Sequence, residues 1–250
     1  MTLVATPTPS HVPAAPQARA DLLAISHGTS SEAGQAAIAA LVDAVAERAR
    51  GVRVRPGFVD VQRPDVPDVL AEVDQGATAV IVPLLLSAGY HVHVDLARAA
   101  RRSPVPTLVA AALGPDRRLV DVLEQRLAQS GRDEGDGVVL AAAGSSDERS
   151  VRDCERMAVS LAARLGCRVD VGFVSAAVPP LAEAIDAARA ASRSGRVVVA
   201  TYLLAPGYFA GLVEAGDADV VTAPLLDGGP PPPALVDLVI DRFAAAAGGR

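Results

Sequence analysis

Two histidines and an aspartate each follow a short apolar run in the first half of the chain. His27 ends the run LLAISH, Asp60 ends GFVD, and His91 ends LLLSAGYH. Two imidazoles and one carboxylate form a nitrogen and oxygen donor set that suits a divalent first-row metal such as iron, cobalt, nickel or zinc. Three protein ligands leave coordination positions open, as a working metal site needs and a closed structural site does not. The pattern therefore predicts a reactive metal site at these three residues.

The second half of the chain repeats this pattern without its ligands. LLAISHGTS at Leu22–Ser30 matches VVLAAAGSS at Val138–Ser146, and LLLSAGYH at 84–91 matches YLLAPGYF at 202–209. The residues that correspond to the three ligands lie 116, 115 and 118 positions further along, and they are Ala143, Ser175 and Phe209. Because these side chains bind metals poorly or not at all, we expect one site per chain, in the first half.

Both halves alternate short β-branched runs with longer helical patterns, which is typical of βαβ units and a parallel sheet. The predicted strands are 21–26, 52–59, 78–86, 107–112, 138–142, 168–174, 197–203 and 220–223. The predicted helices are 31–50, 64–74, 93–102, 115–129, 147–165, 178–192, 207–215 and 234–247. The sequence thus predicts an α/β protein with two tandem open parallel-sheet domains of the Rossmann or flavodoxin type, related by internal duplication.

Composition suggests where these domains begin and end. Residues 1–20 are rich in proline and alanine, so a disordered tail is predicted there. Residues 21–130 are predicted to form the domain that carries the site, and residues 137–250 the degenerate repeat. The polar, glycine-rich segment SGRDEGDG joins the two.

All three ligand candidates stand where a predicted strand ends. Ligands of an open parallel sheet bind outside the carboxyl ends of its strands, so these residues are expected to meet at one edge. Gly28 recurs in the second half as Gly144, which indicates a tight turn that the fold needs. Tyr90 recurs as Tyr208, which favours a packing role for this tyrosine.

Charge and hydropathy exclude some functions. The formal net charge of −6 argues against non-specific binding of nucleic acid. No apolar run reaches the roughly 18 residues that cross a bilayer, and the first residues lack the pattern of a secretory signal. Cys154 and Cys167 lack the spacing of a zinc site and are predicted to be free thiols. These features together predict a cytoplasmic protein.

Three motifs, in order, resemble the sirohydrochlorin chelatase family, the CbiX/SirB-type class II tetrapyrrole chelatases. They are SHGT at 26–29, FVD at 58–60 followed by Pro64, and the stretch from Pro83 to Asp95. The resemblance covers the first half directly and the second half through the repeat. Members of this family insert a divalent metal into a tetrapyrrole in siroheme or cobalamin synthesis. The chain resembles the long members, which fuse two chelatase domains.

The resemblance implies roles for the three ligand candidates. His27 and His91 match the metal-binding and catalytic histidines, and Asp60 stands where the family commonly has glutamate. The shorter aspartate leaves open whether this carboxylate binds the metal directly. His93 is a further candidate, as a residue that acts beside the ligands and is not itself one of them, because positions two apart on a helix point to different sides. The implied metal is a substrate, Co²⁺, Fe²⁺ or Ni²⁺, and no organic cofactor is implied.

The implied second substrate is an acidic tetrapyrrole. Neutral histidines can accept the pyrrole protons that leave when the metal enters, and arginines suit the carboxylates of the macrocycle. The arginine candidates are Arg98, Arg101, Arg102 and Arg63, with a solvated helix face as an equal alternative. Phe209 is expected to offer the macrocycle an apolar surface across a cleft between the halves. Because the fused halves supply both walls, a monomer is expected.

Two other functions compete with this hypothesis. A metallochaperone or metal-storage protein would use the same His27, Asp60 and His91 set without binding a macrocycle. A histidine phosphatase would also place His-Gly after its first strand, but it carries arginine before the histidine, where this chain has Ser26. The phosphatase hypothesis therefore ranks low.

Overall fold

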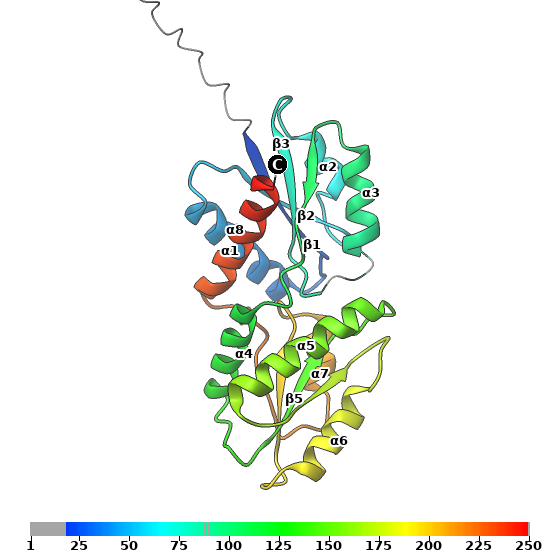
Figure 1. Cartoon of the computed structure of the whole chain (residues 1–250), viewed down its shortest axis with the longest axis vertical. Helices are drawn as coiled ribbons and strands as arrows, with labels where there is room; N and C mark the ends of the chain where they lie inside the picture. The colour runs from blue at the N-terminus through cyan, green and yellow to red at the C-terminus, as the bar shows by residue number, and fades with distance from the viewer. Residues whose placement is uncertain (1–18, 88, 90, 250) are drawn as a thin grey trace, which may run out of the picture.

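The chain forms two stacked α/β lobes, one from each half of the sequence (Figure 1). The computed structural model describes residues 19–87, 89 and 91–249, without the side chains of 91–93. The tail predicted at 1–20 lies almost wholly outside these residues, and Ala20 already belongs to the first strand. Each lobe has a four-stranded parallel sheet, ordered β2-β1-β3-β4 in the first and β6-β5-β7-β8 in the second. The predicted fold class and duplication are confirmed.

Every predicted strand and helix is present. The strands are β1 Ala20–Ser26, β2 Val54–Phe58, β3 Thr78–Pro83, β4 Thr107–Val109, β5 Gly137–Ala142, β6 Val169–Phe173, β7 Val197–Tyr202 and β8 Val220–Val221. The helices are α1 Glu32–Arg48, α2 Val66–Ala71, α3 Ala97–Arg102, α4 Arg117–Gln129, α5 Glu148–Leu165, α6 Leu181–Ala191, α7 Tyr208–Glu214 and α8 Pro233–Gly248. A π-helical turn, η1 at His91–Leu96, precedes α3, so the helix predicted at 93–102 begins two residues earlier.

Local chemistry explains these boundaries. The central strands β3 and β7 are buried along their whole length, as expected of near-continuous apolar runs covered on both faces. The side chain of Ser31 accepts a hydrogen bond from the Gly34 amide and caps α1. Asp65 and Asp68 form a capping box at the start of α2. Short loops therefore follow the carboxyl ends of β1 and β2, and each leads to a helix with a fixed starting point.

The two lobes exchange their last helices. Helix α4 follows the first sheet in sequence but packs against α5 and β7 of the second lobe. Helix α8 ends the chain but packs against α1 and β3 of the first lobe, as Figure 1 shows for the red helix beside α1. One continuous hydrophobic core therefore contains residues of both halves, such as Leu41 and Leu238. This packing crosses the predicted domain limits at 130 and 137.

The exchange also carries polar contacts. The Arg242 guanidinium on α8 donates to the carbonyl oxygens of Ala112 (2.8 Å) and Leu113 (2.9 Å), just before α4. Arg118 on α4 pairs with Asp241 on α8 at 2.5 Å.

Within the described residues, no helix is long and apolar enough to cross a membrane.

A buried arginine on α4 tests this exchange. Arg126 is 6% exposed and donates to the carbonyl oxygens of Pro224 and Leu225 and to the carboxylate of Asp227. We expect Arg126→Ala to lower the free energy of unfolding by about 3 kcal/mol, because the substitution leaves these acceptors without their hydrogen-bond donor. Urea denaturation followed by circular dichroism measures the change.

The control is an exposed arginine, Arg152, which pairs with Glu148 on the surface of α5. Arg152→Ala should change the free energy of unfolding by about 0.5 kcal/mol or less, as for other exposed helical pairs. Equal effects of the two substitutions would contradict the structural role given to Arg126.

Candidate metal centre

The loops that carry His27 and Asp60 continue the pairing of β1 with β2. The Val59 amide donates to the Ser26 carbonyl, and the Asp60 amide donates to the His27 carbonyl, both at 2.9 Å. Both His27 and Asp60 have exposed side chains. The structure therefore brings these two predicted ligands to the same edge of the sheet, side by side.

A glycine makes this approach possible. Gly28 has a φ of 95°, and a Cβ built on it would lie 2.0 Å from the Asp60 carbonyl oxygen. The equivalent Gly144 has a φ of 90°, and its Cβ would lie 1.7 Å from the Ser175 carbonyl oxygen. Only glycine combines this backbone conformation with so close a contact. The tight turns predicted from the retained glycines are confirmed.

Further hydrogen bonds fix the Asp60 loop. The Val61 amide donates to Asp60 Oδ1 at 2.7 Å, and Val61 itself has a φ of 64°. A β-branched residue rarely adopts this conformation, and such strain is often found at functional sites. The Gln62 side chain accepts a bond from the Thr29 amide at 2.9 Å and ties the His27 loop to the Asp60 loop. Sequence reasoning missed Gln62, because a loop amide gives no motif.

His91 comes from the strand on the other side of β1. Strand β1 lies between β2 and β3, so the loops after β1 and β3 flank the point where the strand order reverses. Open α/β sheets bind their ligands at this switch point. His91 is the first residue of the π-helical turn η1, and such turns are frequent at functional sites. The side chains of His91 and His93 lie outside the described part of the chain.

The second lobe holds the segment that leads to His91. The Tyr202 hydroxyl at the end of β7 donates to the Leu86 carbonyl at 2.9 Å. Burial raises the pKa of Tyr202 well above its usual value, so the phenol remains a donor at neutral pH. The hydroxyls of Ser87 and Ser150, the latter on α5, are 2.5 Å apart. The position of the third ligand candidate therefore depends on contacts with the opposite lobe.

The reverse contact is made by the loop after β7. A Cβ built on Gly34 would lie 2.3 Å from the Pro206 carbonyl oxygen, and one built on Gly207 would lie 3.3 Å from Thr29 Oγ1. This loop therefore lies against the first turn of α1 and against Thr29, which is two residues after His27. Each sheet presents its carboxyl edge to the other lobe.

Phe209, the counterpart of His91, lies in the first turn of α7 at this junction and is 41% exposed. The neighbouring Tyr208 is 74% exposed, and the two rings meet edge to face with centroids 5.5 Å apart. Tyr90, for which the recurrence favours packing, lies outside the described residues, and its counterpart Tyr208 is exposed.

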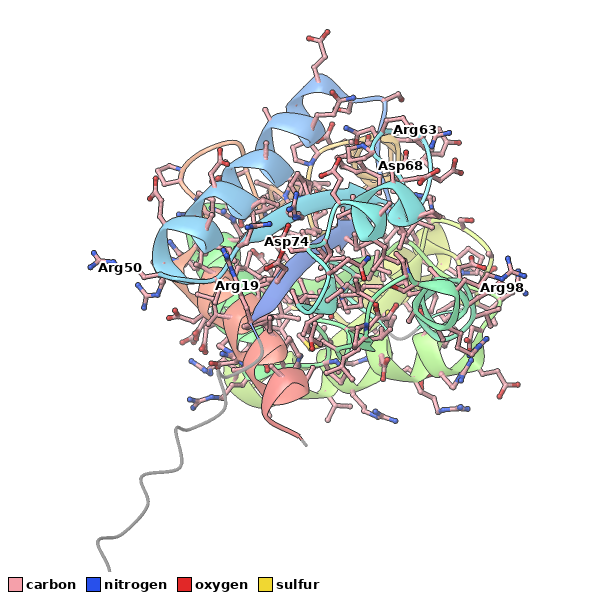
Figure 2. All side chains as sticks on the ribbon, turned by 90° about the horizontal axis from the view of Figure 1, so that it is seen from above. Arg19, Arg50, Arg63, Asp68, Asp74 and Arg98 are labelled. Atoms are coloured by element: carbon pink, nitrogen blue, oxygen red, sulfur yellow. The ribbon has the colours of Figure 1, made fainter. Side chains whose placement is uncertain are left out.

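The four arginine candidates lie in two different settings. Arg98, Arg101 and Arg102 are exposed on α3. Arg98 and Arg102 line a shallow cavity of about 340 Å³ between α2 and α3, together with Asp65 and Asp95. Arg63 instead forms ion pairs with the carboxylates of Asp65 and Asp68 at the start of α2. Figure 2 shows Arg63 beside Asp68, with Arg98 at a separate place on the rim of the first lobe.

Among the described residues, no group of three His, Cys, Asp or Glu side chains is arranged to hold a metal ion. The set His27, Asp60 and His91 includes a side chain outside that range, so it stays a prediction. Its backbone positions at the carboxyl ends of β1, β2 and β3 agree with that prediction.

Comparison with known proteins assigns the chain to a family. The CbiX family model matches residues 21–130 and 137–215, which is most of both lobes. The chain belongs to the CbiX family. The resemblance seen in the sequence motifs is thereby confirmed, and the match to both segments agrees with the internal duplication.

Two relatives match parts of the chain. Sirohydrochlorin ferrochelatase of Priestia megaterium is 32% identical over 160 residues, which are 60% of this chain and 60% of that protein. Sirohydrochlorin cobaltochelatase of Sulfolobus acidocaldarius is 31% identical over 77 residues, which are 29% of this chain and 63% of that protein. The chain thus spans about 60% of the length of these relatives.

Solved structures share the two-lobed CbiX fold. SirB from Bacillus subtilis with Fe³⁺ superposes with a TM-score of 0.74 at 21% identity, over 92% of this chain and 96% of that one. SirB from Bacillus subtilis subspecies spizizenii in complex with cobalt superposes with a TM-score of 0.69 at 20% identity, with the same coverage. These likenesses show the fold.

The turn at Gly28 predicts a position-specific effect of adding one methyl group. Gly28→Ala should destabilise the protein by at least about 3 kcal/mol, since it adds a clash with the Asp60 carbonyl to the cost of a left-handed alanine. Gly51 is the matched control, because its φ is 84° and no atom lies within 4 Å of the added Cβ. Gly51→Ala should cost only about 1–2 kcal/mol. Urea denaturation compares the two, and equal losses would contradict the close approach.

Proposed function

We propose that this chain is a chelatase that inserts a divalent metal ion into sirohydrochlorin or a related acidic tetrapyrrole. The observation that carries the proposal is the meeting of the His27 and Asp60 loops, with His91 opening η1 on the other side of β1. Three potential ligands thus follow adjacent strands at the edge where open α/β sheets bind ligands. The names of the CbiX relatives, a ferrochelatase and a cobaltochelatase, support the reaction class.

The metal is a substrate in this proposal. His27 and His91 bind Co²⁺ or Fe²⁺, or Ni²⁺, through imidazole nitrogens, which suit these ions better than oxygen-only sets do. Asp60 adds negative charge, and its Oδ1 is oriented by the Val61 amide. Three protein ligands leave the metal open to the macrocycle nitrogens. No organic cofactor takes part.

Insertion also requires that protons leave the macrocycle. Two pyrrole N–H protons are released as the metal enters, and neutral imidazole accepts protons near neutral pH. We assign this proton transfer to His27 and His91, whose loops flank the switch point of the sheet. His93, two residues into η1, is a further candidate for holding or passing on a proton.

One chain is the working unit in this proposal. The second lobe has Ala143, Ser175 and Phe209 at the ligand positions, while its contacts hold the segment before His91.

Arg98, Arg101 and Arg102 are proposed contacts for substrate carboxylates, because they are exposed. Arg63 is the weaker candidate, since two aspartates already engage it. The free thiols of Cys154 and Cys167 fit the cytoplasm.

An anaerobic absorption assay tests the reaction. The full-length chain is mixed with sirohydrochlorin and Co²⁺ or Fe²⁺, and the change of the macrocycle spectrum is followed against the uncatalysed rate. We expect acceleration with at least one of these metals. Normal metal binding without acceleration would instead identify a metallochaperone or storage protein, and it would refute the chelatase proposal.

Paired substitutions test the asymmetry of the halves. His27→Ala should reduce insertion at least about 100-fold, because it removes a metal ligand and a proton acceptor. Asp60→Ala should also reduce insertion, whereas Ser175→Ala at the equivalent position of the second half should leave the rate within about twofold. Initial rates under saturating macrocycle measure all three. A His27→Ala protein with the wild-type rate would remove this histidine from the mechanism.

A further inference from the structure

Most of the large apolar side chains that are exposed in the described part of the chain follow the carboxyl ends of strands. Five described residues of this kind are exposed, and four of them lie just beyond the carboxyl ends of strands: Val61 after β2, Val178 after β6, and Tyr208 and Phe209 after β7. The fifth, Val159, lies on α5. Exposed apolar side chains that gather at one site indicate a ligand or partner surface. These four lie on the edges through which the two lobes face each other.

The aromatic pair on α7 is the largest part of this surface. Tyr208 and Phe209 are 74% and 41% exposed, and their rings meet at an interplanar angle of 67°. Gly207, directly before them, lies against Thr29 in the loop that begins at His27. The pair therefore comes from the second lobe but stands beside the metal-ligand loop of the first.

We infer that Tyr208 and Phe209 form the platform that holds the face of the macrocycle during metal insertion, with Val61 contributing from the first lobe. The inference rests on the proposed function and assigns the macrocycle to residues of the half that has no metal ligands. A tetrapyrrole has two broad apolar faces and an acidic rim. Aromatic rings bind flat π-systems by stacking and by edge-to-face contact. The second half has Phe209 where the first half has His91. In this inference the position therefore contacts the macrocycle in the second half and the metal in the first half.

The position of Val61 supports contact between this apolar surface and the macrocycle. Its side chain is 58% exposed although its backbone has a φ of 64°, a conformation that disfavours valine. The Asp60 carboxylate holds this turn through the Val61 amide. An apolar side chain thus stands next to a predicted metal ligand, where a macrocycle that receives the metal must lie.

Binding of metal-free sirohydrochlorin to the full-length chain tests the inference. Quenching of macrocycle fluorescence gives the Kd without metal or turnover. Phe209→Ala should raise Kd about tenfold, as expected for loss of one stacking partner, and Tyr208→Ala combined with it should raise Kd further. Phe209→Tyr keeps a ring and should restore binding to within about threefold. Val159→Ala, the exposed apolar control on α5, should leave Kd unchanged.

Two additional measurements separate a platform from a general structural role. Phe209→Ala should raise KM for the macrocycle while kcat stays within about threefold, and calorimetric binding of Co²⁺ alone should be unchanged. Wild-type insertion with an unchanged Kd in Phe209→Ala would overturn the platform and leave the chelatase proposal intact. A wild-type chain that binds no macrocycle would overturn both. A dimer that Phe209→Ala dissociates would show that a second copy of the chain covers this surface.

Discussion

The approach of the Gly28 backbone to the Asp60 carbonyl is the constraint on which the candidate site depends. It fixes the loop after β1 against the loop after β2 and leaves no room for a side chain at 28. The second lobe has the same contact between Gly144 and Ser175, although its ligand positions have changed. Backbone geometry was therefore retained in both halves, while the side chains that can bind a metal were retained in one. The glycine turn is therefore a feature of the fold in both lobes, whereas metal binding depends on the side chains at the ligand positions.

The second constraint is the mutual support of the lobes. Each lobe covers one face of its sheet with a helix from the other half, α8 on the first sheet and α4 on the second. The loop before His91 is held by Tyr202 and Ser150 of the second lobe. A half without metal ligands thus remains necessary, because it completes the core and positions the third ligand candidate. This explains how one half can lose its ligands while the chain as a whole keeps a single candidate site.

Sequence patterns predicted the element order, the parallel sheets and the duplication, because strands buried on both faces form apolar runs and aspartate and serine caps mark the helix starts. The convergence of His27 and Asp60 on one edge followed from parallel topology. The helix exchange was not predictable in this way, since the hydrophobic faces of α4 and α8 do not specify which sheet they cover. Likewise, the recurrence of Tyr90 as Tyr208 favoured packing, yet Tyr208 is 74% exposed. Gln62 was missed because its role is a single tertiary hydrogen bond.

In the proposed function, the first half of the chain binds the metal and the second half does not. Anomalous diffraction from crystals of the full-length protein grown with Co²⁺ tests this asymmetry, because it locates each bound ion relative to both lobes. We expect one strong peak per chain, within bonding distance of the His27 and His91 imidazoles and beside Asp60. A peak at Ala143, Ser175 and Phe209, or an ion bound elsewhere with the His27 edge empty, would contradict it.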